Sequence, residues 1–337
     1  MKLIITLRIL MLMALVGGIA YFAHRRGYHF RSKRAPAPVA AAAPQVQNPD
    51  DGAQYHISEA EYSALVDIYY ITSGNRWRNH SGWLNPKAAS WFGVNVSDGH
   101  VIELDLSENN LTGRLPPSLG DLPMLRRLDL SGNFLIGSVP AAVGDLYSLQ
   151  ELVLRGNLFD GLLPDSLTNL VRLKRLDLSE NQLTGTVPAT LETLTNLTSL
   201  DLSHNRLNWT IPDKLDILAR LQELKLSANY LAGRIPESLN ALRALTNLSL
   251  ANNQLSGIVP ALTALRNATI DLTGNRLDID AGSPSLSNIQ AVINAGNSVK
   301  FQPQLTIGSD APKFAKPRKK PAPPTPQPSP SPAPPRP

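Results

Sequence analysis

The sequence predicts an α/β solenoid, a curved array of short parallel strands with an N-terminal helical cap. Seven asparagines recur at one constant interval, and an eighth follows after a slightly shorter one. They are Asn109, Asn133, Asn157, Asn181, Asn205, Asn229, Asn253 and Asn275. Each lies in a unit of the form LxxLxLxxNxLxGxxPxxLxxLxx, and one such unit cannot bury its leucine face alone. The eight units at residues 101–284 must therefore stack into one elongated domain.

The leucines within each unit predict how the unit folds. The LxL segment, as in Leu128 and Leu130, predicts a short strand whose leucines share one face. The later leucines point to the same core from the return path. The asparagine follows the strand, where its amide can bond to turn backbone groups that the strand ladder does not reach.

Residues 1–34 combine an apolar run with a basic flank. Residues 3–23 form the run, which is broken by Arg8. As a helix the run would be about 31 Å long, enough to cross a bilayer. The part after Arg8 alone has the length of a signal-peptide core. The basic residues after the run outnumber Lys2 before it, which favours a cytoplasmic body if the run is an anchor. A membrane anchor and a cleaved signal both remain open.

Two segments outside the array are rich in proline. Residues 35–54 are also rich in alanine and predict an extended linker. Residues 311–337 are basic and predict a disordered tail with polyproline II tendency, after a C-terminal cap at 285–310. Within the tail, Arg318 to Pro324 has the basic PxxP pattern that SH3-type grooves bind, so an SH3-type partner is one hypothesis.

Residues 55–100 extend the pattern upstream of the array. They contain an amphipathic stretch near Ser58 to Thr72 and the segment WFGV before the first strand. Three tryptophans are spaced along them: Trp77, Trp83 and Trp91. With the repeats, this segment resembles plant-type leucine-rich repeat proteins, over roughly residues 58–304, such as receptor-like ectodomains and polygalacturonase inhibitors. The resemblance implies a fold and a protein-binding role; receptors of this type often continue into a kinase, and no kinase domain is expected here.

Composition argues against several classes of function. The 337 residues include no cysteine, so disulfides, thiolate metal sites and cysteine nucleophiles are excluded. The formal net charge of +5 comes from basic residues at the two ends, whereas the central body is close to neutral, which argues against nucleic-acid binding. The serines and carboxylates of the array follow from its repeat. We therefore expect no enzyme activity, no metal and no cofactor.

The concave face of the array is the expected binding surface. Its exposed strand positions should form columns in which neighbouring residues lie about 4.8 Å apart, and eight strands make a column long enough to bind a protein or an extended peptide. Most column residues belong to the LDLS pattern and are expected to be scaffold. One unit departs from this pattern with Val153 and Arg155, and Phe134 and Leu158 directly follow asparagines. We predict that these four residues form an exposed apolar patch beside a cation, the composition of a binding hot spot.

A second candidate site mixes charges with an aromatic ring on adjacent units. It comprises Asp201, His204, Arg206, Lys225 and Tyr230. Nearby, Trp209 stands where the sister unit has Gly185, beyond the concave strand. We expect this tryptophan to cover a neighbouring apolar edge rather than to face a ligand.

Glycosylation sequons favour an exported protein. Six are possible glycosylation sites: Asn79, Asn95, Asn110, Asn196, Asn208 and Asn247. A seventh, at Asn267, falls at a core leucine position of its repeat. The basic flank after residue 23 favours the opposite side of the membrane. In the family that the chain resembles, paired cysteines occupy the positions of Ala89 and Val96, and their absence argues against an oxidising location. The side of the membrane therefore stays open.

The sequence as a whole predicts a non-catalytic, receptor-like recognition protein. It would be tethered to a membrane through residues 3–23, or exported, and would bind a protein or peptide on its concave face. The resemblance to polygalacturonase inhibitors offers an alternative, the inhibition of a cell-wall hydrolase. A structural scaffold or tether is the other alternative.

Overall fold

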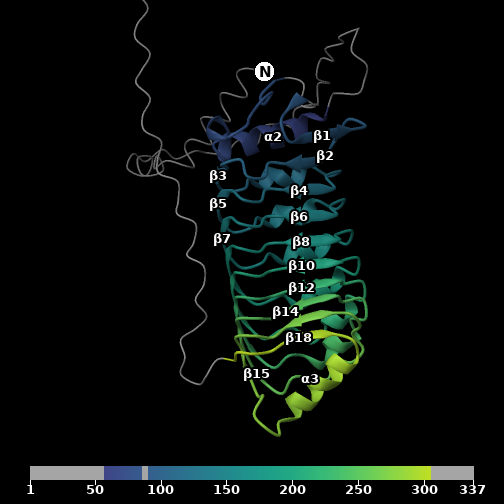
Figure 1. The fold of residues 1–337 in the computed structure, drawn as a ribbon. Coiled ribbons are helices and arrows are strands. Elements are labelled where there is room, and N and C mark those ends of the chain that lie inside the picture. Colours follow the sequence, from purple (N-terminus) through teal and green to yellow (C-terminus); the bar gives the residue numbers. More distant parts are fainter. Residues whose placement is uncertain (1–56, 86–89, 305–337) are drawn as a thin grey trace, which may run out of the picture. The chain divides into compact units, whose positions relative to one another are not determined.

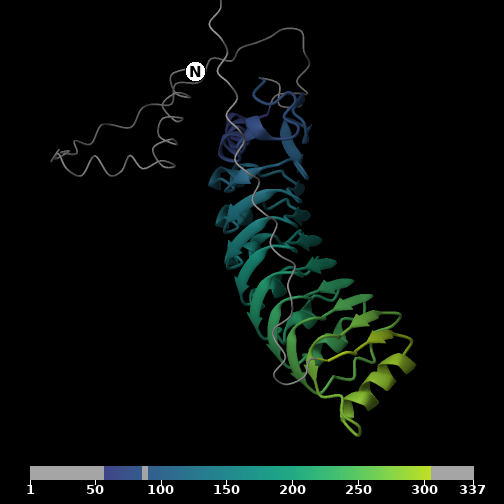
Figure 2. The same ribbon diagram turned by 60° about the vertical axis from the view of Figure 1, so that its left-hand side comes forward.

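Each repeat makes one coil of a stacked array. The computed structural model describes residues 57–85 and 90–304, all within one compact unit of the chain. Successive coils place their strands side by side, as Figure 1 shows, and Figure 2 shows that the stack bends along its length. The α/β solenoid that the asparagine spacing predicts is confirmed.

Ten strands form the first sheet, which runs along the whole stack (Figure 1). The pairing of β1 with β2 is antiparallel, and every later pairing is parallel. Partners in neighbouring repeats are mostly separated by one full repeat, as for Leu128 and Leu152. The strands are β1 (Val94–Ser97), β2 (His100–Asp105), β4 (Arg127–Asp129), β6 (Glu151–Val153), β8 (Arg175–Asp177), β10 (Ser199–Asp201), β12 (Glu223–Lys225), β14 (Asn247–Ser249), β16 (Thr269–Asp271) and β18 (Ser298–Lys300).

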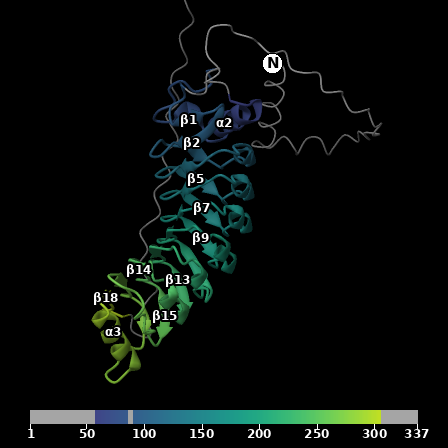
Figure 3. The same ribbon diagram turned by 90° about the vertical axis from the view of Figure 1, so that its right-hand side faces the viewer.

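Eight further strands form a second sheet along another side of the stack (Figure 3). Its partners are separated by slightly less than one full repeat, as for Thr112 with Phe134 and Ile136 with Leu158. Most of these strands begin at the residue directly after the repeat asparagine. The strands are β3 (Thr112–Gly113), β5 (Phe134–Gly137), β7 (Leu158–Gly161), β9 (Gln182–Gly185), β11 (Arg206–Trp209), β13 (Tyr230–Gly233), β15 (Gln254–Gly257) and β17 (Arg276–Leu277).

The return path of most repeats contains a short 3₁₀ helix. These helices are η5 (Pro117–Asp121), η6 (Ala141–Asp145), η7 (Asp165–Asn169), η8 (Ala189–Thr193), η9 (Leu215–Ile217) and η10 (Glu237–Ala241). A proline such as Pro140 precedes most of them, and its fixed φ suits the start of a helix. Leucines from the strands and from this path fill one continuous core, in which Leu128, Leu146 and Leu149 are fully buried.

The repeat asparagines join neighbouring coils. The Nδ2 of Asn205 donates to the carbonyl oxygens of Leu178 (2.9 Å), in the preceding repeat, and Leu202 (3.1 Å), in its own. Its Oδ1 accepts from the backbone N–H of Leu183 at 3.0 Å. Because Asn205 is 1% exposed, these bonds satisfy backbone groups that water cannot reach. The predicted role of the asparagine ladder is thereby confirmed.

A helical cap covers the first strand of the array. Helix α2 (Glu59–Ile71) begins with a capping box between Ser58 and Glu61. Glu61 is 1% exposed, and its carboxylate accepts from the backbone N–H of Val101 at 3.1 Å, which joins the helix to β2. The short helix η3 (Gly74–Arg76) follows. The three spaced tryptophans are buried beside these elements, and each indole N–H donates to a backbone carbonyl: Trp77, Trp83 and Trp91.

The other end of the array is closed by helix α3 (Pro284–Asn294) and strand β18. Asn297 lies before β18 and joins it to the preceding coil, since its Oδ1 accepts from Ala268 N–H at 2.9 Å. After β18, Gln304 takes the ladder position of the repeat asparagines, because its Oε1 accepts from Leu277 N–H at 3.2 Å and its Nε2 donates to the Leu272 carbonyl at 3.1 Å. The last described residue therefore lies beside β17, at the edge of the second sheet.

Candidate ligand-binding faces

The outward side chains of the first sheet form two columns, which we call the first-sheet face. The first column holds Glu103, Arg127, Glu151, Arg175, Ser199, Glu223, Asn247 and Thr269. The second holds Asp105, Asp129, Val153, Asp177, Asp201, Lys225, Ser249 and Asp271. Eight of these sixteen residues are carboxylates and three are cations, so the face carries an excess of negative charge.

The aspartates of the second column are bonded within their own repeats. The Oδ1 of Asp129 accepts from the hydroxyl of Ser131 at 2.6 Å and from its backbone N–H at 3.0 Å. The same two bonds recur in every other repeat that has an aspartate there: Asp105, Asp177, Asp201 and Asp271. These aspartates close the turn after each strand, as expected for scaffold residues.

Arg127 lies among four carboxylates, a grouping that sequence reasoning did not select. Its guanidinium nitrogens lie 3.0 Å from Glu103, 3.4 Å from Asp129 and 3.6 to 3.7 Å from Asp105 and Glu151. Burial acts to lower the pKa of Arg127, but Asp105, Glu103 and Asp129 outweigh it and raise that pKa above its usual value. One cation thus offsets only part of the negative charge at this end of the face. The sequence does indicate this grouping, because glutamate and arginine alternate along the first column.

The predicted apolar patch is divided between the two sheets. Val153 lies in β6 and Arg155 shortly after it, whereas Phe134 and Leu158 begin β5 and β7 of the second sheet. Val153 is only 6% exposed, so the prediction of an exposed anchor there is wrong. Its side chain is short, and the strands around it carry longer arginine and glutamate side chains. Phe134 and Leu158 are half-buried.

Arg155 is exposed but is engaged within the array. Its Nη2 lies 2.6 Å from Oε1 of Glu180 in the next repeat, and its Nε lies 3.1 Å from the same oxygen. The hydrogen bond to Glu180 is the main cause of a raised Arg155 pKa. Arg155 replaces the usual serine and Glu180 precedes a repeat asparagine, so the alignment of repeats could have suggested this pair.

The second candidate group is also divided. Asp201 and Lys225 are partners in β10 and β12 of the first sheet. His204 follows β10 with a φ of 55° and is exposed. Arg206 and Tyr230 begin β11 and β13 of the second sheet, where Arg206 pairs with Thr184 and Tyr230 with Asn208. The structure therefore pairs only Asp201 with Lys225 on the first-sheet face.

Replacing Asp201 with asparagine is expected to stabilise the fold at neutral pH. Burial, and then the charge of Asp177, raise the pKa of Asp201 above its ordinary value of 3.8, so the folded state binds this proton more tightly than the unfolded state. The charged carboxylate therefore opposes folding at pH 7. An asparagine oxygen can still accept both bonds from Ser203.

This stabilisation should depend on pH. For Asp201, stability rises as pH falls through the raised folded-state pKa towards 3.8, so the advantage of Asp201→Asn should shrink over that window. Urea titrations of both proteins at several pH values measure it. A variant whose advantage grows as the pH falls would contradict the assignment.

The sequons differ in how freely their amides are presented. Asn95 and Asn208 are exposed. Asn196 uses its Nδ2 to donate to the carbonyl oxygen of Val171 at 2.8 Å, a bond that a glycan on this nitrogen would disturb. Asn247 lies in the first column, and Asn79 and Asn110 are half-buried. Asn95 and Asn208 are the most accessible of the six.

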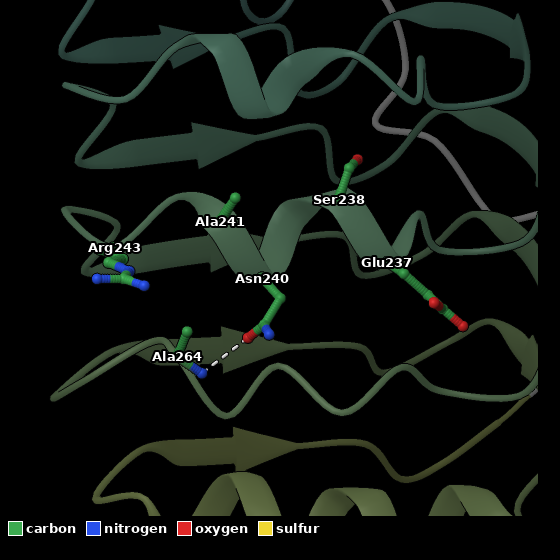
Figure 4. A pocket seen from close by; sticks show the side chains of 6 residues that line it. All are labelled: Glu237, Ser238, Asn240, Ala241, Arg243 and Ala264. Atoms are coloured by element: carbon green, nitrogen blue, oxygen red, sulfur yellow. Dashed lines mark hydrogen bonds between the residues drawn. The ribbon is translucent and has the colours of Figure 1, made fainter.

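Two adjoining cavities lie over η10, and neither has the arrangement of a catalytic centre. Figure 4 shows the smaller one, of about 360 Å³, where Glu237 and Arg243 lie beside short side chains. Asn240 is engaged there, because its Oδ1 accepts from Ala264 N–H at 2.7 Å. Among residues 57–85 and 90–304, no group of His, Cys, Asp and Glu could hold a metal ion.

Several sequence predictions lie outside the described residues. These are the apolar run at 3–23, the linker at 35–54 and the proline-rich tail with its SH3-type pattern. Within the described ranges, no helix has both the length and the apolar character needed to span a bilayer.

Comparison with known proteins identifies the repeats. Two leucine-rich repeat family models match, one at residues 147–207 and the other at 100–122, 124–146, 220–242 and 244–265. The PEPR1–AtPEP1 complex superposes with a TM-score of 0.61 and 28% identity, over 70% of this chain and 37% of that one. The ectodomain of the Arabidopsis receptor kinase HAESA, in complex with an extended IDA peptide hormone, has a TM-score of 0.54 and 32% identity, over 64% of this chain and 41% of that one.

A plant ice-binding protein shares the fold alone. Its TM-score is 0.54 and its identity 24%, over 77% of this chain and 99% of that one. A comparison with curated proteins finds no match. The chain spans 37% to 41% of the two receptor chains above, so it corresponds to part of their length.

The repeat ladder and these matches define the fold. The chain contains leucine-rich repeats in an α/β solenoid, and this repeat array is similar to that of plant receptor ectodomains.

Proposed function

We propose that this protein recognises a protein or peptide ligand through its first-sheet face, without catalysis, while tethered to a membrane or exported. The observation that carries this proposal is the run of outward side chains along the strands β2 to β16, with eight carboxylates against three cations. Such a face offers both length and a charge pattern to an extended ligand.

The receptor structures support a ligand-binding role. The HAESA ectodomain is in complex with a peptide hormone ligand, and it shares 32% identity with this chain. Similarity of fold alone would not be enough to propose ligand binding, since the ice-binding protein has the same fold.

The proposed membrane tether rests on residues 3–23, whose sequence suits an anchor or a signal. Protease protection of an epitope in the tail would report which side of a membrane the array occupies.

The charge of the face favours a cationic ligand. Around Arg127, four carboxylates surround one guanidinium, and Glu103 and Glu151 are partly exposed there. The aspartates of the second column are largely used in turns, so we expect the glutamates of the first column to contact the ligand. Lysine and arginine side chains would pair with them.

Selection of displayed random peptides on the full chain tests this proposal. We expect the recovered peptides to be rich in lysine and arginine. Glu103→Lys with Glu151→Lys should weaken their binding by about tenfold or more, because the charge at two contacts is reversed. Binding is measured by calorimetry at two salt concentrations, and circular dichroism confirms folding.

A matched variant controls for net charge. Asp121→Lys with Asp165→Lys makes the same change in charge on the exposed 3₁₀ helices η5 and η7. This variant should bind the selected peptides as the parent does. Equal loss of binding in both variants would indicate a general charge effect and would refute the role of the first-sheet face.

A further inference from the structure

Trp209 occupies a backbone position that other repeats reserve for glycine. It ends β11 with a φ of 73°, in the left-handed region. Six sister repeats carry glycine at this place, also with positive φ: Gly113, Gly137, Gly161, Gly185, Gly233 and Gly257. A bulky L-residue is strained in this conformation, whereas glycine is not. The tryptophan is therefore unfavourable for the backbone that carries it.

Burial does not compensate for this strain. The side chain of Trp209 is 68% exposed, so the expectation that it covers an apolar edge is wrong, although its position beyond the first sheet is confirmed. Asn208 and Thr210 beside it are exposed as well. A strained residue whose large apolar surface faces solvent suggests a function at that site.

A groove begins in the repeat that carries Trp209. This larger cavity, of about 680 Å³, is lined by Asp213 from that repeat, by residues of the next two repeats and by Asn288 of α3. Its apolar lining includes Pro236, Pro260 and Ile258, and Ile258 is 47% exposed. Asp213 and Glu237 add two exposed carboxylates. Trp209 is not one of the lining residues, but it precedes Asp213 by only four residues. Aromatic, apolar and acidic groups together make the kind of surface that basic, proline-rich peptides bind.

Arg234 is the one cation that lines this groove among the described residues. Its side chain extends along the second sheet over Gly257, away from Trp209 and towards β17. Two carboxylates against this one cation leave the groove with a negative balance.

The chain leaves the array on the same side. Pro303 accepts from Gly274 N–H, and Gln304 bonds to Leu277, so the residues after 304 start at the edge of the second sheet. In that sheet, β17, β15, β13 and β11 are consecutive neighbours. Four steps of about 4.8 Å separate Gln304 from β11, which is roughly 19 Å. An extended chain covers roughly 3.3 Å per residue, so about six residues after Gln304 span this distance.

The segment at this distance has the matching chemistry. Residues 311–324 read APKFAKPRKKPAPP, with five cations and five prolines. We propose that residues 311–324 of the chain dock in this groove and reach Trp209, four residues before the lining residue Asp213. Prolines stack on the indole and on Ile258, and lysines or arginines pair with Asp213 and Glu237. The first-sheet face stays free, so this contact is independent of the proposed ligand-binding role.

Quenching of tryptophan fluorescence by acrylamide in the full chain tests the proposal. The chain has four tryptophans, and the other three are buried, so accessible emission reports on Trp209. In the parent protein we expect Trp209 to be protected. Reversing four tail charges, with Lys316→Glu, Arg318→Glu, Lys319→Glu and Lys320→Glu, should raise the accessible fraction severalfold. Asp213→Lys with Glu237→Lys should do the same.

Three controls test whether the protection of Trp209 is specific to the tail. Reversing Arg172 and Arg220, exposed basic residues of the array, should leave Trp209 protected. In the charge-reversed tail variant, Trp209→Gly should abolish the fluorescence that is accessible to acrylamide. This variant should fold, because it restores the glycine of the sister repeats. A synthetic peptide of residues 311–324 should protect Trp209 again in the charge-reversed tail variant. The proposal would be overturned if acrylamide quenched Trp209 freely in the parent protein. It would also be overturned if the protection of Trp209 decreased on dilution, because the tail would then dock on a second copy of the chain.

Discussion

Replacing Asn205 with alanine is expected to lower the free energy of unfolding by about 3–5 kcal/mol. The change removes the partner of Leu183 N–H and one of the two amide donors of each of the carbonyl oxygens of Leu178 and Leu202, all inside the core. A methyl group cannot bond to them, and water cannot reach them. The loss should also weaken cooperation between neighbouring coils, since two of these three bonds cross between repeats.

Urea denaturation followed by circular dichroism measures this loss. Asn169→Ala is the matched control, because Asn169 is exposed in η7 and its removal exposes no buried group. The control should change stability by less than about 0.5 kcal/mol. Equal stabilities of the Asn205→Ala and Asn169→Ala proteins would show that the ladder does not hold the coils together.

Replacing Glu61 with alanine should destabilise the cap by about 2–4 kcal/mol. Glu61 is 1% exposed and accepts from Val101 N–H at 3.1 Å, from the Ser58 hydroxyl at 2.8 Å and from Ser58 N–H at 3.2 Å. Its loss leaves a buried strand N–H without a partner and removes half of the capping box of α2. Because the cap covers the end of the array, fraying should begin there.

Hydrogen exchange locates this fraying. Exchange should accelerate in α2 and β2 of the Glu61→Ala protein and should stay unchanged near α3. Glu59→Ala, in the same helical turn, serves as the control because Glu59 is exposed. If exchange rose uniformly along the array, Glu61 would have no special part in closing it.

The fold was largely predictable from the sequence because every repeat has the same pattern of leucines and asparagine. Leucine spacing gives the strand and return path, and the constant asparagine interval gives the register of the first sheet. The second sheet was not predicted. Its strands follow from a turn geometry that brings Thr112 into register with Phe134, slightly short of a full repeat, and no apolar alternation marks them.

The candidate sites were less predictable for the same reason. Phe134 and Leu158 were placed on the concave face because they follow the asparagine, but the chain turns there into the second sheet. Val153 is an outward strand residue, yet its exposure depends on the length of side chains from neighbouring coils. Spacing identifies which residues share a column, whereas burial and pairing depend on contacts between columns.

The unusual position of Trp209 is recognised only when sequence and structure are combined. The alignment of repeats shows that it replaces a glycine, and the structure adds its positive φ and its 68% exposure. Neither observation alone separates a structural tryptophan from a binding one. Together they direct attention to the second sheet as a further surface for contacts.

Carboxylate footprinting of the array with a selected cationic peptide tests the central claim most directly. Carbodiimide labelling of the free and bound protein is compared by mass spectrometry. We predict that the peptide protects Glu103, Glu151 and Glu223 on the first-sheet face and leaves Asp121 and Asp165 on the 3₁₀ helices labelled as before. Protection of the helices with unchanged labelling of the three glutamates would contradict recognition through the first-sheet face.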